Sequence, residues 1–157
     1  MTQTKTFAPD YEKDENGWFI FPRDVTWRKK LFPQIAMEHP SKMNMYVCQE
    51  IINYVSEPGD IIVDCFGGTG TTAIAAHDGR SVVLMELERP YVDIQRATIE
   101  DWTEKDIITG SVMSLQGDNR KLLPFPCDHM IFSPPYANDM MKDHGGALNE
   151  EIQVYRL

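Results

Sequence analysis

The fold of this chain is decided by residues 61–72, which read IIVDCFGGTGTT. The first three of these residues form a short apolar run of the kind that becomes a strand buried on both faces of a parallel sheet. The small residues 73–76, after the glycine-rich turn, predict a helix that ends near Gly79. A glycine-rich turn between a strand and a helix lets a ligand approach the backbone closely, because no side chain intervenes and the helix N-terminus directs its free N–H groups outward.

The alternation of apolar runs and helical periods continues downstream. Buried strands are expected at residues 82–85, 112–115 and 130–132, and a helix is expected from Pro90 until it fades near Trp102. Strands that alternate with helices indicate an α/β fold with right-handed connections. We therefore expect an incomplete parallel sheet of about four strands with flanking helices.

Residues 1–40 differ from the rest of the chain. They contain the aromatic cluster 18–21 but no sustained helical or alternating period, so we expect an extended N-terminal arm. A helix is expected to start at an N-cap Ser41 and to stop at Pro58. The expected organisation has three parts: the extended arm at 1–40, an α/β core at 41–136, and a loop with a short C-terminal helix or tail at 137–157.

Length and composition place the chain among globular proteins. With 157 residues, of which 42% are hydrophobic, it is expected to build one core with room for a cofactor pocket but no second domain. No stretch approaches the roughly 18 apolar residues of a membrane span, and residues 1–5 lead into no apolar signal core. We expect neither export nor membrane insertion, and a cytoplasmic location.

The three cysteines, Cys48, Cys65 and Cys127, lie far apart and form no Cys-x-x-Cys pair. Because a structural zinc site needs several ligands at characteristic spacings, we expect no metal site. Cysteines without a pairing pattern agree with a reducing compartment.

The chain carries a formal net charge of −9. Nucleic acid should repel so acidic a protein unless its positive charge is concentrated locally. In residues 23–42, Asp24 and Glu38 are outnumbered by five cations, namely Arg23, Arg28, Lys29, Lys30 and Lys42. These cations form either a strip that contacts phosphates or a solvated face beside apolar residues that pack on the core.

An acidic residue ends the second expected strand. Glu86 lies 19 residues after Gly67, where a carboxylate can accept hydrogen bonds from both ribose hydroxyls of a nucleoside. Residues 68–73 also have the G-x-G-x-x-A form of a dinucleotide fingerprint. Together these features predict a cofactor that contains adenosine, without saying which one. A surface carboxylate at a strand end is the alternative for Glu86.

The fourth expected strand runs into residues 133–136, which read SPPY. Ligands of a doubly wound sheet bind at this carboxyl edge. Two consecutive prolines hold the backbone extended and present carbonyl oxygens outside any strand ladder. The oxygen of Ser133 and the carbonyl of Pro134 can accept the two protons of a flat, amino-bearing base, and the Tyr136 ring can stack on it. A Pro-Pro turn with a packing tyrosine is the alternative.

In their order and spacing these motifs resemble one family, the S-adenosylmethionine-dependent amino-methyltransferases that act on DNA. The resemblance covers about residues 39–136. It rests on five elements: residues 39–42, residues 64–72, Glu86 with Tyr91, Gly117-Asp118, and residues 133–136. It implies a Rossmann-like class I methyltransferase fold, with the core at 41–136 as its cofactor-binding and catalytic part.

The resemblance also implies roles for single residues. S-adenosylmethionine would be the cofactor, with Asp118 at its adenine amino group, Glu86 at its ribose and His39 near its carboxylate. The methionine part would be held by the segment around the glycine loop, namely Asp64, Cys65, Phe66, Gly67, Gly68, Gly70 and Thr71. The catalytic pocket would be formed by Ser133, Pro134, Pro135 and Tyr136.

The implied function is transfer of a methyl group to the exocyclic amino group of a base in DNA. The base has to be flipped out of the duplex to be reached. A serine at the first position of the tetrapeptide is associated in this family more often with cytosine N4 than with adenine N6, so cytosine is favoured. The alternatives are an RNA or protein-glutamine amino-methyltransferase, a non-catalytic fragment that binds cofactor or a partner, and a dinucleotide oxidoreductase.

The chain departs from the family in its length. It stops 21 residues after Tyr136, whereas the family continues with further strands and a region that reads DNA. We expect a truncated or split protein, with DNA and a second, completing polypeptide as partners, in the cytoplasm of a bacterium or a phage-infected cell. Alone, the sheet would expose a hydrophobic edge beside the fourth strand, and methylation would be weak or absent.

Overall fold

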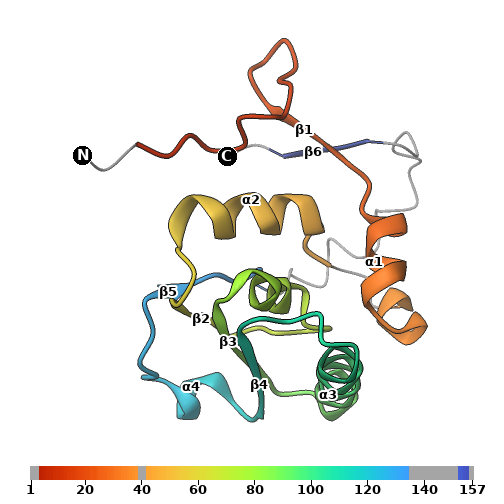
Figure 1. Ribbon diagram of the computed structural model, residues 1–157, viewed down its shortest axis with the longest axis vertical. Helices are drawn as coiled ribbons and strands as arrows, with labels where there is room; N and C mark the ends of the chain where they lie inside the picture. The colour runs from red at the N-terminus through yellow and green to blue at the C-terminus, as the bar shows by residue number, and fades with distance from the viewer. Residues whose placement is uncertain (1–3, 39–41, 135–151, 156–157) are drawn as a thin grey trace.

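The computed structural model describes residues 4–38, 42–134 and 152–155 of the chain. Its centre is a four-stranded parallel sheet in the order β4-β3-β2-β5 (Figure 1). The strands are β2 (Ile61–Asp64), β3 (Ser81–Glu86), β4 (Ser111–Gln116) and β5 (His129–Met130). The predicted parallel α/β architecture is confirmed. The fourth strand is shorter than expected, although the Ile131 N–H still donates to the Val63 carbonyl of β2.

The central strand β3 is buried on both faces, as its continuous apolar run predicts. Val82 and Leu84 pack into a core cluster on one face of the sheet. Val83 and Met85, which point the other way, belong to a second cluster. Because side chains alternate along a strand, one apolar run contributes to both layers.

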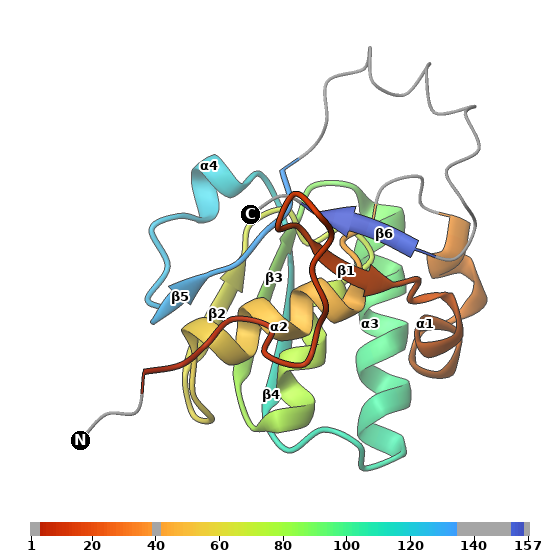
Figure 2. The same cartoon turned by 90° about the horizontal axis from the view of Figure 1, so that it is seen from above.

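One face of the sheet is covered by α2 (Met45–Val55), the 3₁₀ helix η2 (Thr71–Asp78) and α3 (Arg89–Glu104), as Figure 2 shows. The other face carries the short helix α4 (Asn119–Leu122) and the apolar residues after it. Helix α2 begins at Met45 rather than near Ser41, which lies outside the described residues. Its N-cap is Asn44, whose side chain accepts hydrogen bonds from the N–H groups of Tyr46 and Val47.

The prediction of an extended arm over residues 1–40 is wrong for residues 25–31 and 34–38, which are helical. This segment forms β1 (Phe19–Pro22), α1 (Val25–Leu31) and the 3₁₀ helix η1 (Gln34–Glu38). Phe21 and Phe32 are buried, and Phe32 packs edge-on against Trp102 of α3 with ring centroids 5.2 Å apart. Tertiary contacts of these aromatic rings, which leave no periodic signal in the sequence, stabilise the short elements.

A strand occupies part of the segment for which a short helix or tail was expected. This strand, β6 (Ile152–Tyr155), pairs antiparallel with β1, and the two lie side by side in Figure 1. The pairing joins positions more than a hundred residues apart, so a local pattern could not reveal it. Among the described residues, no helix combines the length and the apolar character needed to cross a membrane.

Candidate cofactor and catalytic site

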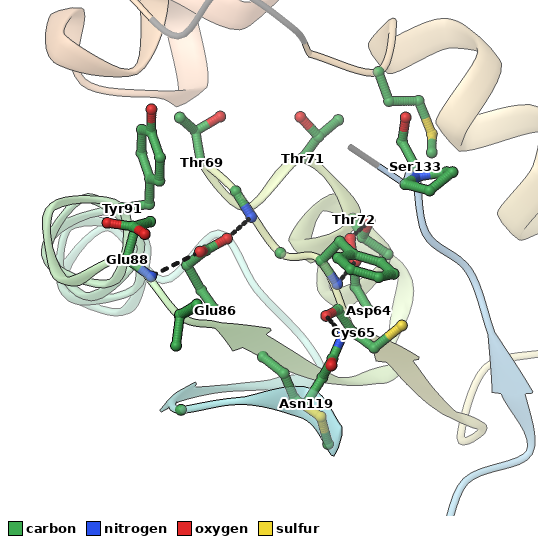
Figure 3. A pocket seen from close by; sticks show the side chains of 18 of the residues that line it. Asp64, Cys65, Thr69, Thr71, Thr72, Glu86, Glu88, Tyr91, Asn119 and Ser133 are labelled. Carbon is green, nitrogen blue, oxygen red and sulfur yellow. Dashed lines mark hydrogen bonds between the residues drawn. The ribbon is translucent and has the colours of Figure 1, made fainter. Parts of the chain in front are cut away.

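A cavity of about 650 Å³ lies at the carboxyl edge of the sheet. Figure 3 shows its labelled walls: Asp64 and Cys65 at the end of β2, the glycine loop, Glu86 at the end of β3, Asn119 after β4, and Ser133 after β5. The predicted site residues that line it are Asp64, Cys65, Phe66, Gly67, Gly68, Thr71, Glu86, Asp118, Ser133 and Pro134. Gly70 supports the loop without lining the cavity, and His39, Pro135 and Tyr136 lie outside the described residues.

The glycine loop depends on glycine for two different reasons. At Gly67 a Cβ would lie 2.8 Å from the side-chain nitrogen of Gln95, so the position is needed for packing behind the loop. Gly70 has a φ of +89°, a conformation that side chains disfavour, and it opens η2. The loop is closed by the Gly67 N–H, which donates to the Met85 carbonyl at 2.8 Å, and by the Gly70 N–H, which donates to the Gly67 carbonyl at 2.7 Å.

Glu86 ties the glycine loop to the start of α3. Its carboxylate accepts hydrogen bonds from the Gly68 N–H at 2.7 Å and from the Glu88 N–H at 2.9 Å (Figure 3). Each carboxylate oxygen has two lone pairs, so both retain the capacity to accept a ligand hydroxyl. The geometry therefore fits the predicted role at a ribose and adds a structural one.

Asp64 is a buried carboxylate at the end of β2, with 4% of its surface exposed. It accepts hydrogen bonds from the Thr72 hydroxyl at 2.5 Å and from the Phe66 N–H at 3.0 Å. Burial raises the pKa of Asp64 to about 6, against the lowering effect of these two hydrogen bonds. The cavity thus has a carboxylate at its base whose charge changes just below neutral pH.

Asp118 starts α4 and holds its carboxylate against Arg120. The Arg120 guanidinium donates to it at 2.9 Å and 2.6 Å, and the Arg120 N–H donates at 3.0 Å. These hydrogen bonds lower the pKa of Asp118 to about 2. An adenine amino group that reached Asp118 would share the carboxylate with Arg120.

Arg28, placed by the sequence in a basic strip, is buried with only 1% of its surface exposed. Its guanidinium donates to the carboxylate of Asp24, to the Thr71 hydroxyl at 2.8 Å and to the Met43 carbonyl at 2.7 Å. Both expectations for this residue, a phosphate contact and a solvated face, are wrong. Of the other cations, Lys42 lines the cavity, and Arg23, Lys29 and Lys30 are exposed.

The start of the predicted catalytic tetrapeptide reaches the same cavity. Ser133 and Pro134 lie in its wall, a few residues after the end of β5 at Met130. Phe132 packs against Phe66 of the glycine loop, with ring centroids 5.6 Å apart. The segment that follows β5 and the glycine loop are therefore in contact beside Ser133.

A family model described as DNA methylase, N6_N4_Mtase, matches residues 3–97. The chain belongs to this DNA methylase family. The resemblance drawn from the motifs is thereby confirmed. S-adenosylmethionine is the cofactor of the family, as the sequence predicted.

Two bacterial methyltransferases illustrate the similarity to curated relatives. Type II methyltransferase M.BglI of Bacillus subtilis is 33% identical over 64 residues, which are 40% of this chain and 18% of the relative. Type II methyltransferase M2.DpnII of Streptococcus pneumoniae is 35% identical over 66 residues, which are 41% of this chain and 25% of the relative. The match therefore spans a quarter or less of each of these relatives.

Solved structures share the fold at low sequence identity. TrmN from Thermus thermophilus has a TM-score of 0.53 and 19% identity, over 69% of this chain and 33% of the other. A putative methyltransferase from Porphyromonas gingivalis W83 has a TM-score of 0.54 and 18% identity, over 72% of this chain and 29% of the other. At this identity the likeness establishes the Rossmann-like methyltransferase fold alone.

The residues present fit the cofactor of the family. S-adenosylmethionine combines a nucleoside with an amino acid, and the cavity offers carboxylate acceptors at Asp64 and Glu86, the Lys42 ammonium, and the glycine backbone. Two supporting residues were missed by the sequence analysis. Asn119 donates to the Cys65 carbonyl at 2.9 Å, and Gln95 donates to the Gly68 carbonyl at 2.8 Å. The one signal that could have indicated Gln95 is its polar side chain at a position of α3 that faces the interior.

Proposed function

We propose that this chain is the cofactor-binding and catalytic part of a DNA amino-methyltransferase. It would transfer a methyl group to the exocyclic amino group of a base, with cytosine N4 favoured over adenine N6. The observation that carries the proposal is a juxtaposition: Ser133 and Pro134 share one cavity with the glycine loop and Glu86. The methyl donor and the amino group therefore have neighbouring sites. A DNA substrate would place the reaction in the cytoplasm of a bacterium or a phage-infected cell.

The proposed chemistry depends on how the chain holds the amino nitrogen. The bound cofactor supplies a sulfonium methyl group, which the nitrogen takes as the S–C bond breaks and one amino proton is released. The Ser133 oxygen and the Pro134 carbonyl accept hydrogen bonds from the two N–H groups of the amine, which favours a tetrahedral nitrogen with a free lone pair. Most of the rate then comes from positioning and electrostatics, without a covalent enzyme intermediate.

The base reaches this pocket only when it has left the duplex. We assign Pro135 and the stacking ring of Tyr136 to the same pocket, and His39 to the carboxylate end of the cofactor. Ser133, rather than an aspartate or asparagine, is the reason for favouring cytosine. The exposed cations Arg23, Lys29 and Lys30 supply local positive charge in a chain of net charge −9.

A direct test incubates this chain, together with the polypeptide that completes it, with labelled S-adenosylmethionine and unmethylated duplex DNA, followed by mass spectrometry of the nucleosides. N4-methylcytosine is the expected product, and N6-methyladenine would overturn the base preference. Ser133→Ala should lower the yield at least about tenfold, because one acceptor for the amino protons is lost. Label found only in RNA or protein acceptors would overturn the DNA assignment.

We further propose that another stretch of polypeptide, in the same or a separate chain, completes the sheet and reads the target. Among the described residues β5 pairs only with β2, and the neighbouring Met130 and Phe132 are 46% and 40% exposed. A groove of about 430 Å³ runs between β5 and α2. The chain by itself should methylate DNA weakly or not at all. Robust turnover without a partner would contradict this part of the proposal.

A further inference from the structure

Gln95 is a polar side chain held in the interior between α3, β4 and the glycine loop. It is 1% exposed and lies among apolar neighbours such as Val92 and Ile94. Its side-chain nitrogen donates to the Gly68 carbonyl at 2.8 Å, and its oxygen accepts from the Ser114 hydroxyl of β4 at 2.6 Å. A buried amide of this kind costs free energy unless it is fully paired, so the interactions that it makes here are specific.

The orientation of this amide has only one solution. A main-chain carbonyl accepts hydrogen bonds and cannot donate, so the Gln95 nitrogen has to face Gly68. The Gln95 oxygen then faces Ser114, and the serine hydroxyl supplies the proton. Ser114 therefore orients Gln95, and Gln95 orients the peptide between Gly68 and Thr69.

The direction of that peptide matters for the cavity. In a trans peptide the carbonyl and the following N–H point in opposite directions. With the Gly68 carbonyl turned towards the buried Gln95, the Thr69 N–H is turned away from it, to the side of the loop that lines the cavity. Within the described part of the chain, nothing accepts a hydrogen bond from this N–H.

We propose that Gln95 is a positioning residue that aims the Thr69 N–H at a ligand acceptor in the cofactor cavity. The adjoining peptide is held separately, by the Gly68 N–H that donates to Glu86. Gln95 thus holds the loop from the buried side while Glu86 holds it from the side of β3. The inference rests on the proposed function and deepens it, because it names a residue that affects cofactor affinity without touching the cofactor.

The substitution Gln95→Glu tests this role through its pH dependence. A protonated glutamate can still donate to the Gly68 carbonyl, whereas an ionised one brings two acceptors together. Burial and the Glu86 carboxylate, which accepts from the N–H of the same Gly68, favour the protonated form at acidic pH. We expect Q95E to bind S-adenosylhomocysteine within about threefold of wild type at about pH 5.5, and at least about tenfold more weakly at about pH 8.

The measurement is calorimetric titration of S-adenosylhomocysteine, expressed as the ratio of variant to wild-type affinity at each pH. The ratio removes the titration of Asp64, which both proteins share. Gln34→Glu, the same change at an exposed position, is the matched control and should give a flat ratio near one. A flat ratio for Q95E would overturn the proposal.

A milder pair of variants covers the case in which Q95E does not fold. Ser114→Ala should weaken binding several-fold with little change in thermal unfolding, and Ser114→Thr, which keeps the hydroxyl, should restore it. Equal affinity of S114A and wild type would count against the proposal.

A wild-type chain that binds no S-adenosylhomocysteine would overturn the proposed function. In that event the NMR chemical shift of the Thr69 amide still tests the role of Gln95. This chemical shift should change with pH more in Q95E than in Q34E. Equal changes in the two variants would refute the positioning role.

Discussion

Asp64 shows at the scale of one residue how the fold sets a proton affinity. The same carboxylate that accepts hydrogen bonds from Thr72 and Phe66 is almost fully buried. An aspartate in the unfolded chain has a pKa near 4, and burial raises that of folded Asp64 to about 6. Between these values the folded protein binds more protons than the unfolded chain, so the free energy of unfolding falls as the pH rises through this range.

This difference predicts the behaviour of Asp64→Asn. The variant lacks the titration, so its free energy of unfolding relative to wild type should rise by about 2–3 kcal/mol from about pH 4 to about pH 7. Urea unfolding of both proteins at the two pH values measures the change. A difference between the proteins that does not depend on pH would contradict the assignment.

Glu86 supports a second prediction at this scale, on the cofactor. In Glu86→Gln one side-chain oxygen becomes an NH₂ group, which would face the N–H of Gly68 or Glu88 donor to donor. Cofactor affinity should fall about tenfold or more at neutral pH. Calorimetric titration measures it, with Glu100→Gln at an exposed position of α3 as the control. Unchanged affinity of E86Q would exclude the ribose role.

At the scale of elements, helix α1 is fastened to the site by one side chain. Arg28 joins α1 to Thr71 at the start of η2 and to the Met43 carbonyl just before α2, and it pairs with Asp24. Asp24 in turn accepts from the Met45 N–H. The N-terminal segment therefore supports the wall of the cofactor cavity through Thr71 and Met43 without lining the cavity itself.

Arg28→Met should destabilise the fold by about 3 kcal/mol, because it leaves the Asp24 carboxylate and the Met43 carbonyl without their cation. Chemical denaturation is the measurement. The exposed neighbour provides the control, since Lys29→Met should change the free energy of unfolding by no more than about 0.5 kcal/mol. Equal effects of the two substitutions would show that the buried pair is dispensable. Asp24→Asn combined with Arg28→Met should cost less than the sum of the single changes.

At the scale of the whole molecule, the sheet edge at β5 is a predicted surface for self-association. Met130 and Phe132 are exposed beside an unpaired row of backbone groups, within the part of the chain that the structure describes. Such an edge favours pairing with another chain. Phe132→Lys should lower the concentration-dependent association of the isolated chain in sedimentation velocity, whereas Ile35→Lys, at another exposed apolar position, should leave it unchanged. Association that persists in F132K would place the contact on another surface.

Local sequence determined the parallel α/β core, the glycine turn and the carboxylate at Glu86. Apolar runs of strand length, glycines and a strand-end acid each act over a few neighbouring residues, so their signals survive in the sequence alone. The family and its cofactor followed from the order of these motifs.

Only the tertiary structure decided the partners of Arg28 and Gln95. Arg28 donates a hydrogen bond to Thr71, which is 43 positions away in the sequence, and Gln95 accepts one from Ser114 on another element. The pairing of β1 with β6 is equally remote in sequence. Hydrogen bonds between distant residues leave no periodic pattern and no characteristic spacing in the sequence. Their partners are brought together by the packing of elements that the local patterns have already formed.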